Sequence, residues 1–319
     1  MKPFRFLADP GDVTDGPSLA DAARRAEAMG YAALIYPDHV VAAFGMVPLL
    51  AWAAAATERL RVAPFVANND LRHPALLAQD LATLDVLSGG RVEVAVGAGW
   101  NRPEYDAMGI GFDPVGVRVG RLTEAVAVIK GCFGDGPFSF AGEHYTITAH
   151  DGLPKPAQRP GPPLFIGGGG RRVLTLAGRE ADIVGLAPRT LPSAAGGPIV
   201  CSDPRSITIA ATEEKLGWVR EAAGDRFGAL ELNVYPTGSA PQLTDHPRTA
   251  AADILDGIRA RTGVELDVDD YLESPHVFIG SVDGLVAKLR ELRERLGISS
   301  FMLGDTDTLA PVVERLAGT

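Results

Sequence analysis

The chain has 319 residues, of which 46% are hydrophobic and 22% charged, a balance typical of a soluble globular protein with a large core. The net charge of −10 argues against a surface for nucleic acid or for an anionic membrane. The amino-terminal stretch has no apolar signal region, and the longest apolar run, Met46–Ala56, is too short to span a bilayer. We therefore expect a cytoplasmic protein with neither a nucleic-acid nor a membrane partner.

Short β-branched runs alternate along the chain with longer segments of helical period. The expected strands are Phe4–Asp9, Ala32–Tyr36, Leu60–Ala67, Arg91–Val96, Leu164–Ile166, Ala181–Ala187, Leu230–Tyr235 and Ser299–Asp305. All but the last are clearly followed by a helical pattern, which favours an α/β fold of the TIM (β/α)8 barrel type with insertions over a doubly wound sheet. Since no composition shift marks a linker, we expect one domain over residues 1–319.

Several local signals mark where elements begin and end. The sequence SLAD from Ser18 has the form of a capping box, which predicts a helix from there to Gly30. Pro74 suits the first position of another helix, and Pro137–Ile147 predicts a small hairpin inserted before the fifth strand. The segment Pro188–Ser206 is rich in Pro, Gly and Ser and follows the sixth strand, where both an active-site lid and plain disorder fit.

The active site of a TIM barrel lies at the carboxyl ends of its strands, so polar residues just after the strands are the candidates. They are Asp9, Asp38-His39, Asn68–Asp70, Gly97–Trp100, Gly167–Arg172, Ala187–Arg189, Tyr235 and Gly304-Asp305. Asp38 and His39 offer the most chemistry, because a histidine exchanges a proton near neutral pH and a neighbouring carboxylate can orient it. An equally weighted alternative is that Asp38 caps the next helix.

Other barrel chemistries fit the same positions poorly. No lysine lies on an expected strand, as a Schiff-base aldolase would need. A carboxylate pair for glycoside hydrolysis is weak, because Glu104 lies out in a loop and Glu231 lies early in its strand. No histidine pair has zinc-site spacing, the cysteines (Cys132 and Cys201) lie far apart, and few strands end in acidic residues. We therefore expect no metal.

Four consecutive glycines, Gly167–Gly170, follow the fifth strand and precede Arg171 and Arg172. The pattern lacks the third glycine of the dinucleotide motif GxGxxG and does not follow the first strand of its unit. Bare backbone amides ahead of a helix start form an anion-binding nest. Phosphate binding is therefore favoured over a purely structural turn.

Several motifs together resemble one known family. They are YPDH at Tyr36–His39, FVANNDLRHP at Phe65–Pro74, ATLDVLSGGRVEVAVGAGW at Ala82–Trp100, GLPKPAQRPGPPLFIGGGG at Gly152–Gly170 and ADIVGL at Ala181–Leu186. The chain resembles, over nearly its whole length, the bacterial luciferase-like superfamily. It is especially similar to the branch dependent on the deazaflavin coenzyme F-420 (F420). The motifs are specific for the superfamily but separate its two cofactors, F420 and FMN, poorly.

The resemblance implies a cofactor ring lying across the strand ends of a luciferase-like TIM barrel. It implies a cis peptide near Phe65–Val66 that supports the ring, with His39 near the hydride-transfer face. It assigns the coenzyme phosphate to Gly167–Arg171 and places Asn68 at the ring edge. The cofactor-binding set is Phe65, Val66, Asn68, Gly97, Gly99, Gly167, Gly168, Gly169, Gly170 and Arg171.

One departure from the family pattern concerns the substrate. Some sugar-phosphate dehydrogenases of the family carry a catalytic glutamate where this chain has Trp100. We therefore do not expect a sugar phosphate as the substrate. Trp100 fits two roles equally well: it could pack on the ring or substrate, or it could pack within its loop. Asp9 and Trp100 are the candidate pocket residues for a small-molecule substrate.

Three functions remain as hypotheses at this point. The first is an F420-dependent oxidoreductase, in which His39 exchanges the proton and Asp38 orients it. The second is a luciferase-like monooxygenase that uses FMN and oxygen, and the third is a non-catalytic flavin-binding protein or partner subunit. A homodimer is left open.

Overall fold

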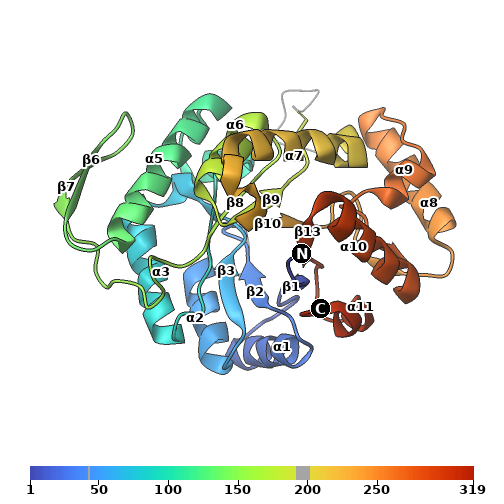
Figure 1. The fold of residues 1–319 in the computed structure, drawn as a ribbon, viewed down its shortest axis with the longest axis horizontal. Coiled ribbons are helices and arrows are strands. Elements are labelled where there is room, and N and C mark those ends of the chain that lie inside the picture. The colour runs from blue at the N-terminus through green and yellow to red at the C-terminus, as the bar shows by residue number, and fades with distance from the viewer. Residues whose placement is uncertain (42–43, 192–201) are drawn as a thin grey trace.

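The computed structural model describes residues 1–41, 44–191 and 202–319. A barrel of parallel strands lies at the centre, with helices around it (Figure 1). The barrel strands are β1 (Arg5–Ala8), β2 (Ala33–Tyr36), β3 (Arg61–Pro64), β4 (Ala67–Asn68), β5 (Val94–Gly97), β8 (Leu164–Gly168), β9 (Ile183–Leu186), β10 (Glu231–Val234) and β13 (Ile298–Met302). This confirms all eight expected strands and the TIM-barrel class.

The sheet runs in the order β3-β2-β1-β13-β10-β9-β8-β5-β4. β3 and β4 are the two halves of one expected strand, interrupted at Phe65–Val66. A parallel bridge between Val62 and Val92 links β3 to the segment that leads into β5. The nine-stranded sheet is therefore nearly closed into a barrel.

The helices lie on the outside of the barrel. They are α1 (Gly16–Ala28), α2 (Met46–Ala56), α3 (Pro74–Ser88), α4 (Arg102–Met108), α5 (Val115–Phe133), α6 (Arg171–Glu180), α7 (Ile209–Ala223), α8 (Pro247–Thr262), α9 (Val268–Glu273), α10 (Val282–Leu296) and α11 (Ala310–Leu316). Short 3-10 turns cover Asn69–Leu71, Pro204–Ile207 and Gly224–Ala229. In the described part of the chain, no helix is long and apolar enough to cross a membrane.

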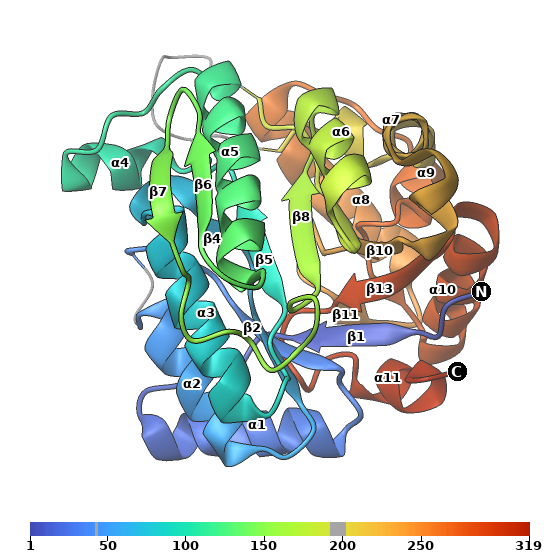
Figure 2. The same cartoon turned by 60° about the vertical axis from the view of Figure 1, so that its left-hand side comes forward.

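Two insertions extend the barrel. The predicted hairpin is present as β6 (Phe138–Ala141) and β7 (Thr146–His150), beside α5 (Figure 2). Glu124 of α5 anchors it by accepting hydrogen bonds from the amides of Glu143, His144 and Tyr145 at 2.8, 2.9 and 3.0 Å. The second insertion, with α8, α9 and the strand pair β11 (Gln242–Leu243) and β12 (Ile279–Gly280), was not predicted.

The expected start of the first helix is wrong by two residues. The cap of α1 is Asp15, whose side chain accepts the Ser18 amide at 2.8 Å, while the Ser18 hydroxyl accepts the Asp15 amide at 3.1 Å. Asp15 and Ser18 thus form the capping box, with Ser18 at the third helical position. Pro17 lies between them in the first turn, where proline is well tolerated. The Pro74 prediction is confirmed, with His73 as the cap of α3.

Apolar side chains fill both the helix–strand interface and the barrel interior. The apolar stripes of α5 and α10 are buried: Leu122, Ala125, Val126, Ile129, Phe133, Leu285, Leu289, Leu292 and Leu296. Each of these side chains except that of Ala125 contributes about 1.5–3 kcal/mol when fully buried. Inside the barrel, Phe65 joins two clusters, one with Leu7 and Ile35 and one with Phe165. Phe65 therefore lies between the two halves of the interior.

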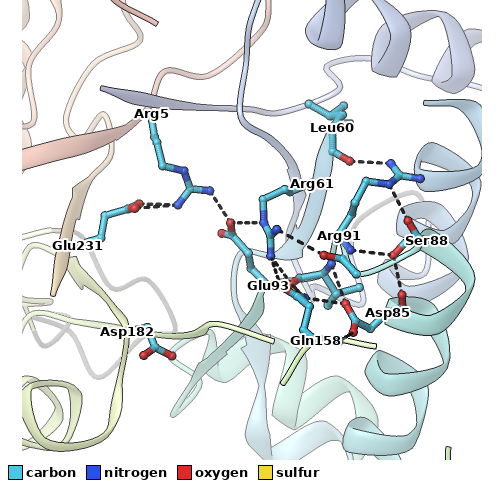
Figure 3. Close-up of polar contacts among 12 residues, drawn as sticks. Arg5, Leu60, Arg61, Asp85, Ser88, Arg91, Glu93, Gln158, Asp182 and Glu231 are labelled. Carbon is cyan, nitrogen blue, oxygen red and sulfur yellow. Dashed lines mark hydrogen bonds and ion pairs between the residues drawn. The ribbon is translucent and has the colours of Figure 1, made fainter. Parts of the chain in front are cut away.

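The amino-terminal end of the barrel is closed by charged side chains (Figure 3). Arg5 at the start of β1 donates to both oxygens of Glu231 at 2.7 and 2.9 Å and also to Glu93. Arg61 at the start of β3 donates through Nε to Glu93 at 2.8 Å. The charges of these two arginines and two glutamates thus compensate one another where they are partly buried, and the ion pairs hold the starts of their strands together. The candidate site lies at the opposite, carboxyl end of the barrel.

Candidate active site

His39 and Glu104 form a pair at the carboxyl ends of β2 and β5. His39 Nδ1 lies 3.0 and 2.9 Å from the two carboxylate oxygens of Glu104, which enters from the first turn of α4. The Glu104 side chain is 1% exposed and that of His39 29% exposed. Because an ionised carboxylate only accepts hydrogen bonds, it selects the ring form with a proton on Nδ1. The imidazole is therefore held through Nδ1, while part of its side chain stays exposed.

The prediction that Asp38 orients His39 is wrong. The Asp38 carboxylate accepts the Asn68 amide at 3.1 Å and pairs with Arg72 at 2.7 Å. Asp38 is buried in these contacts, since neighbouring residues leaving a strand project in different directions. It ties the end of β2 to β4, a role closer to the capping alternative.

Glu104 is the partner of His39 that the sequence does not reveal, because in the sequence it lies out in the loop after the fourth strand. The available signal was its place just after Pro103, since Pro and acidic residues both favour the first turn of a helix. A short helix directly after β5 returns this carboxylate to the barrel mouth.

Trp100 contacts the histidine of this pair. Its ring meets that of His39 edge-on, with centroids 5.5 Å apart and planes at 87°. The Trp100 side chain is half-exposed, so one face of the indole remains open. This contact within the protein leaves both roles, packing on a ring or substrate and packing within the loop, as predictions.

Asn68 is held by a buried polar network. The Tyr105 hydroxyl lies 3.0 Å from Asn68 Oδ1 and 3.0 Å from Asp70 Oδ2, and Arg121 pairs with Asp70 at 2.8 Å. Burial raises the pKa of Tyr105 to about 12, so its hydroxyl stays protonated and can donate. With Oδ1 engaged, the Asn68 amide nitrogen is the group that could meet a ligand.

Two of the predicted glycines allow this network to pack. Gly99 has a φ of +71°, and a Cβ there would lie 1.9 Å from the Tyr105 hydroxyl. A Cβ on Gly97 would lie 2.6 Å from Val66 Cγ2. The Phe65–Val66 peptide is cis, as the resemblance implied. These positions bring the end of β5 against the break between β3 and β4.

The glycines of the four-glycine segment differ in their surroundings, because some lie against protein atoms and Gly170 does not. A Cβ on Gly168 would lie 2.4 Å from Val173, and one on Gly169 would lie 2.3 Å from the Pro188 carbonyl oxygen. Gly170, the cap of α6, has open space around the corresponding position and offers no side-chain hydrogen bond. The first amides of α6 lack intrahelical acceptors, and the helix dipole makes this end positive.

Two predicted site residues point their side chains elsewhere. The Arg171 guanidinium pairs with Glu221 on α7 at 3.1 Å rather than covering Gly170. The Asp9 carboxylate accepts the Gly11 amide of its own loop at 2.8 Å. Burial raises the pKa of Asp9, and the nearby Asp12 and Asp305 add to that effect. Gly167 lies against Phe165, where a Cβ would come within 3.2 Å of its ring.

The strand ends β9 and β10 are held by buried bases. Lys215 donates to the carbonyl oxygens of Ala187 and Ser206, both at 2.7 Å, which ties together the two ends of the Pro188–Ser206 segment, for which a lid and plain disorder are both expectations. Residues 192–201 of that segment lie outside the described residues. His276 Nδ1 contacts the Tyr235 carbonyl oxygen at 2.9 Å. Within the described ranges, no group of three or more His, Cys, Asp or Glu residues could hold a metal ion.

The comparison with protein families identifies the class. A family model described as Luciferase-like monooxygenase matches residues 3–197. The chain therefore belongs to this family, and its barrel with a break at the third strand agrees with that assignment.

Curated relatives of this chain use two different cofactors. The chain is 38% identical over 128 residues to "FMNH(2)-dependent dimethylsulfone monooxygenase" of Pseudomonas putida, covering 40% of this chain and 35% of the relative. It is 33% identical over 175 residues to "F420-dependent glucose-6-phosphate dehydrogenase" of Kineococcus radiotolerans, covering 51% and 50%. The matches thus span a third to a half of these relatives, and all are oxidoreductases by their names.

Solved structures show the same fold over the whole chain. An F420-dependent secondary alcohol dehydrogenase with an F420-acetone adduct has a TM-score of 0.73 at 20% identity, covering 99% of this chain and 98% of its own. The F420-dependent tetrahydromethanopterin reductase from Methanopyrus kandleri has a TM-score of 0.74 at 20% identity, covering 100% and 98%. At this identity the likeness defines the fold alone.

Proposed function

We propose that the protein is an F420-dependent oxidoreductase that transfers a hydride to or from a small organic substrate. The observation that supports this most is the pairing of His39 with the buried carboxylate of Glu104 at the open barrel mouth. Reduction of a carbonyl adds a hydride to carbon and a proton to oxygen, and oxidation of an alcohol removes both. A histidine backed by a carboxylate is suited to that proton.

The described residues fit a deazaflavin with a phosphate-bearing tail. The carboxyl ends of β5 and β8 carry glycines, so no side chain projects from Gly97 or Gly168, whose missing Cβ positions lie against Val66 and Val173. The uncapped start of α6 at Gly170 suits an anion. When bound, F420 supplies or accepts a hydride, and with carbon in place of the flavin ring nitrogen it favours two-electron transfer over oxygen activation.

Each residue of the pair has a separate task in the proposed reaction. Glu104 keeps a proton on His39 Nδ1 and stabilises the positive charge when the ring gains a second proton. His39 Nε2 then takes the hydroxyl proton during oxidation, or returns it to the oxygen during reduction. Asn68 would offer its amide nitrogen to the cofactor, while Trp100 covers one side of His39.

An FMN-dependent monooxygenase is the second candidate. It is supported by the 38% identity to the dimethylsulfone monooxygenase and by 36% identity over 123 residues to the pyrimidine monooxygenase RutA of Klebsiella pneumoniae. The same strand ends and the same start of α6 would suit FMN, which also ends in a phosphate. The open His39 side chain favours either enzyme over a non-catalytic flavin-binding protein.

Charge placed at Gly170 tests the assigned phosphate position. Gly170→Asp should lower the affinity for F420 at least about tenfold, because the new carboxylate occupies the positive helix end. It should leave the affinity for a deazaflavin lacking the phosphate unchanged. Gly170→Ser, a cap without charge, is the matched control and should retain F420 binding. Equal affinities of wild-type protein for the two deazaflavins would contradict the assignment.

A further inference from the structure

Arg172, the second residue of α6, reaches across to the first turn of the neighbouring helix α5. A Cβ on Gly116 would lie 2.6 Å from the guanidinium nitrogen Nη1 of this arginine, so the guanidinium lies against the backbone of α5 there. The two helices are neighbours on the outside of the barrel (Figure 2). The exposed Arg172 side chain therefore connects the start of α6 with the start of α5.

Among the described residues, no carboxylate compensates the charge of Arg172. The adjacent Arg171 pairs with Glu221 at 3.1 Å, whereas Arg172 takes part in no ion pair within those ranges. The remaining residues, 42–43 and 192–201, include no Asp or Glu that could supply a carboxylate side chain. This guanidinium is therefore available to an anion from outside the chain.

The surroundings of Arg172 are already positive. The first turns of α5 and α6 contain no acidic residue, and neither helix cap forms a side-chain hydrogen bond. The buried Arg118 of α5 donates to the carbonyl oxygens of Ala98 and Asp113 at 2.8 and 2.9 Å. The Asp113 carboxylate pairs with Arg121. Because a helix start disfavours a cation, an uncompensated arginine over it indicates a functional reason, and in a chain of net charge −10 that reason is a bound anion.

The face of α5 that Arg172 contacts carries no side chain of its own at two successive positions. Gly116 and Gly120 are four residues apart and therefore lie on one face of the helix, which we call the glycine face. A Cβ on Gly120 would lie 3.3 Å from His144 Nε2. Arg172 thus lies at the start of the glycine face and His144 lies one turn further along it. Two nitrogen-bearing side chains follow one another in the direction that leads away from α6.

We propose that Arg172 and His144 bind the acidic tail of F420 along the glycine face and so favour F420 over FMN. The inference rests on the proposed function, which assigns the coenzyme phosphate to the start of α6 at Gly170. In F420 the chain continues beyond the phosphate through lactate to γ-linked glutamates, and each glutamate adds one carboxylate. FMN ends at its phosphate and has nothing to offer this arginine.

Binding of three deazaflavins tests the proposal without any turnover. They are F420 with two glutamates, F420 with lactate but no glutamate, and the deazaflavin that lacks the phosphate and everything beyond it. Calorimetry gives the dissociation constants. An exposed ion pair contributes modestly, so the glutamates should increase the affinity of the wild-type protein about fivefold. In about 1 M salt that gain should fall below about twofold, because exposed charges are then screened.

Substitutions locate the contact on α6. Arg172→Gln should remove most of the gain from the glutamates and change the affinity for the phosphate-free deazaflavin less than about twofold, whereas Arg172→Lys should retain part of the gain. His144→Ala should reduce the gain by less than Arg172→Gln does. Arg179→Gln, which removes an exposed arginine from the other end of the same helix, is the matched control and should leave the gain unchanged.

The outcomes separate this inference from the proposed function. Equal affinities for the forms with and without glutamates, or a gain that Arg172→Gln leaves intact, overturn the tail site although the protein binds deazaflavin. A gain that depends on Arg172, in a protein that transfers no hydride, supports the tail site and contradicts the proposed function alone. Binding of FMN with none of the three deazaflavins overturns both.

Discussion

Replacement of Glu104 by Gln tests the pair on which the proposed reaction depends. The side chains are nearly identical in shape, so the buried position stays filled while the negative charge is lost. The carboxylate contacts His39 Nδ1 through two oxygens at 3.0 and 2.9 Å and is 1% exposed. A hydrogen bond to a charged group contributes about 1.5–3 kcal/mol, and this burial favours the upper half of that range.

A loss of about 2–3 kcal/mol of transition-state stabilisation corresponds to a decrease of about 30- to 150-fold in the rate of hydride transfer. Stopped-flow single turnovers of the F420-loaded protein, with the substrate that it converts fastest, measure that rate. F420 affinity should change less than about twofold, because Glu104 contacts His39 rather than the residues proposed to bind the cofactor. Asp106→Asn on the same helix, whose carboxylate is 58% exposed, is the matched control and should leave the rate unchanged.

Nitrogen-15 spectra of the histidine rings provide a readout without substrate. In the wild-type protein the neutral His39 ring should carry its proton on Nδ1, and Glu104→Gln should give a mixture of the two ring forms. A variant whose rate stays within about threefold of wild type, with an unchanged ring form, would refute the role assigned to Glu104.

Two further predictions concern stability, both measured by urea unfolding. Gly109→Ala should cost about 1–2 kcal/mol for its φ of +69° alone, whereas Gly99→Ala, where the Cβ would overlap the Tyr105 hydroxyl, should cost at least about 3 kcal/mol; equal losses would contradict the packing argument. Burial lowers the pKa of His276 to about 3 in the folded protein. Below pH 6.5 the unfolded chain therefore binds a proton that the folded protein does not bind, and the free energy of unfolding decreases by up to about 1.4 kcal/mol for each unit by which the pH is lowered. His276→Asn should remove that loss and the exposed His150→Asn should not; a wild-type stability that is flat from pH 6.5 to 4 would contradict this.

The barrel could be predicted from the sequence because its strands are short, buried runs separated by amphipathic helices. Burial on one helix face leaves a clear period, as in α5 and α10, and the break at Phe65–Val66 followed from the family resemblance. The insertion with α8 and α9 has a weaker pattern, because its apolar residues form a small cluster of their own beside the barrel.

The partners of individual site residues could not be predicted in the same way. Glu104 lies 65 positions from His39, and only the fold of α4 brings them together. Asp38 is adjacent in sequence but turns toward Arg72. The four glycines were predicted to bind phosphate, yet which of them contact protein and which are open depends on atoms distant in the sequence, such as the Pro188 carbonyl oxygen at Gly169.

We infer that the barrel mouth binds a deazaflavin for hydride transfer. The most direct measurement is an anaerobic titration of the purified protein with oxidised F420 and, in parallel, with FMN. Micromolar binding of F420, about −8 kcal/mol, with FMN bound at least tenfold more weakly, is the predicted result. Micromolar binding of FMN with none of F420 would contradict the claim and favour the monooxygenase.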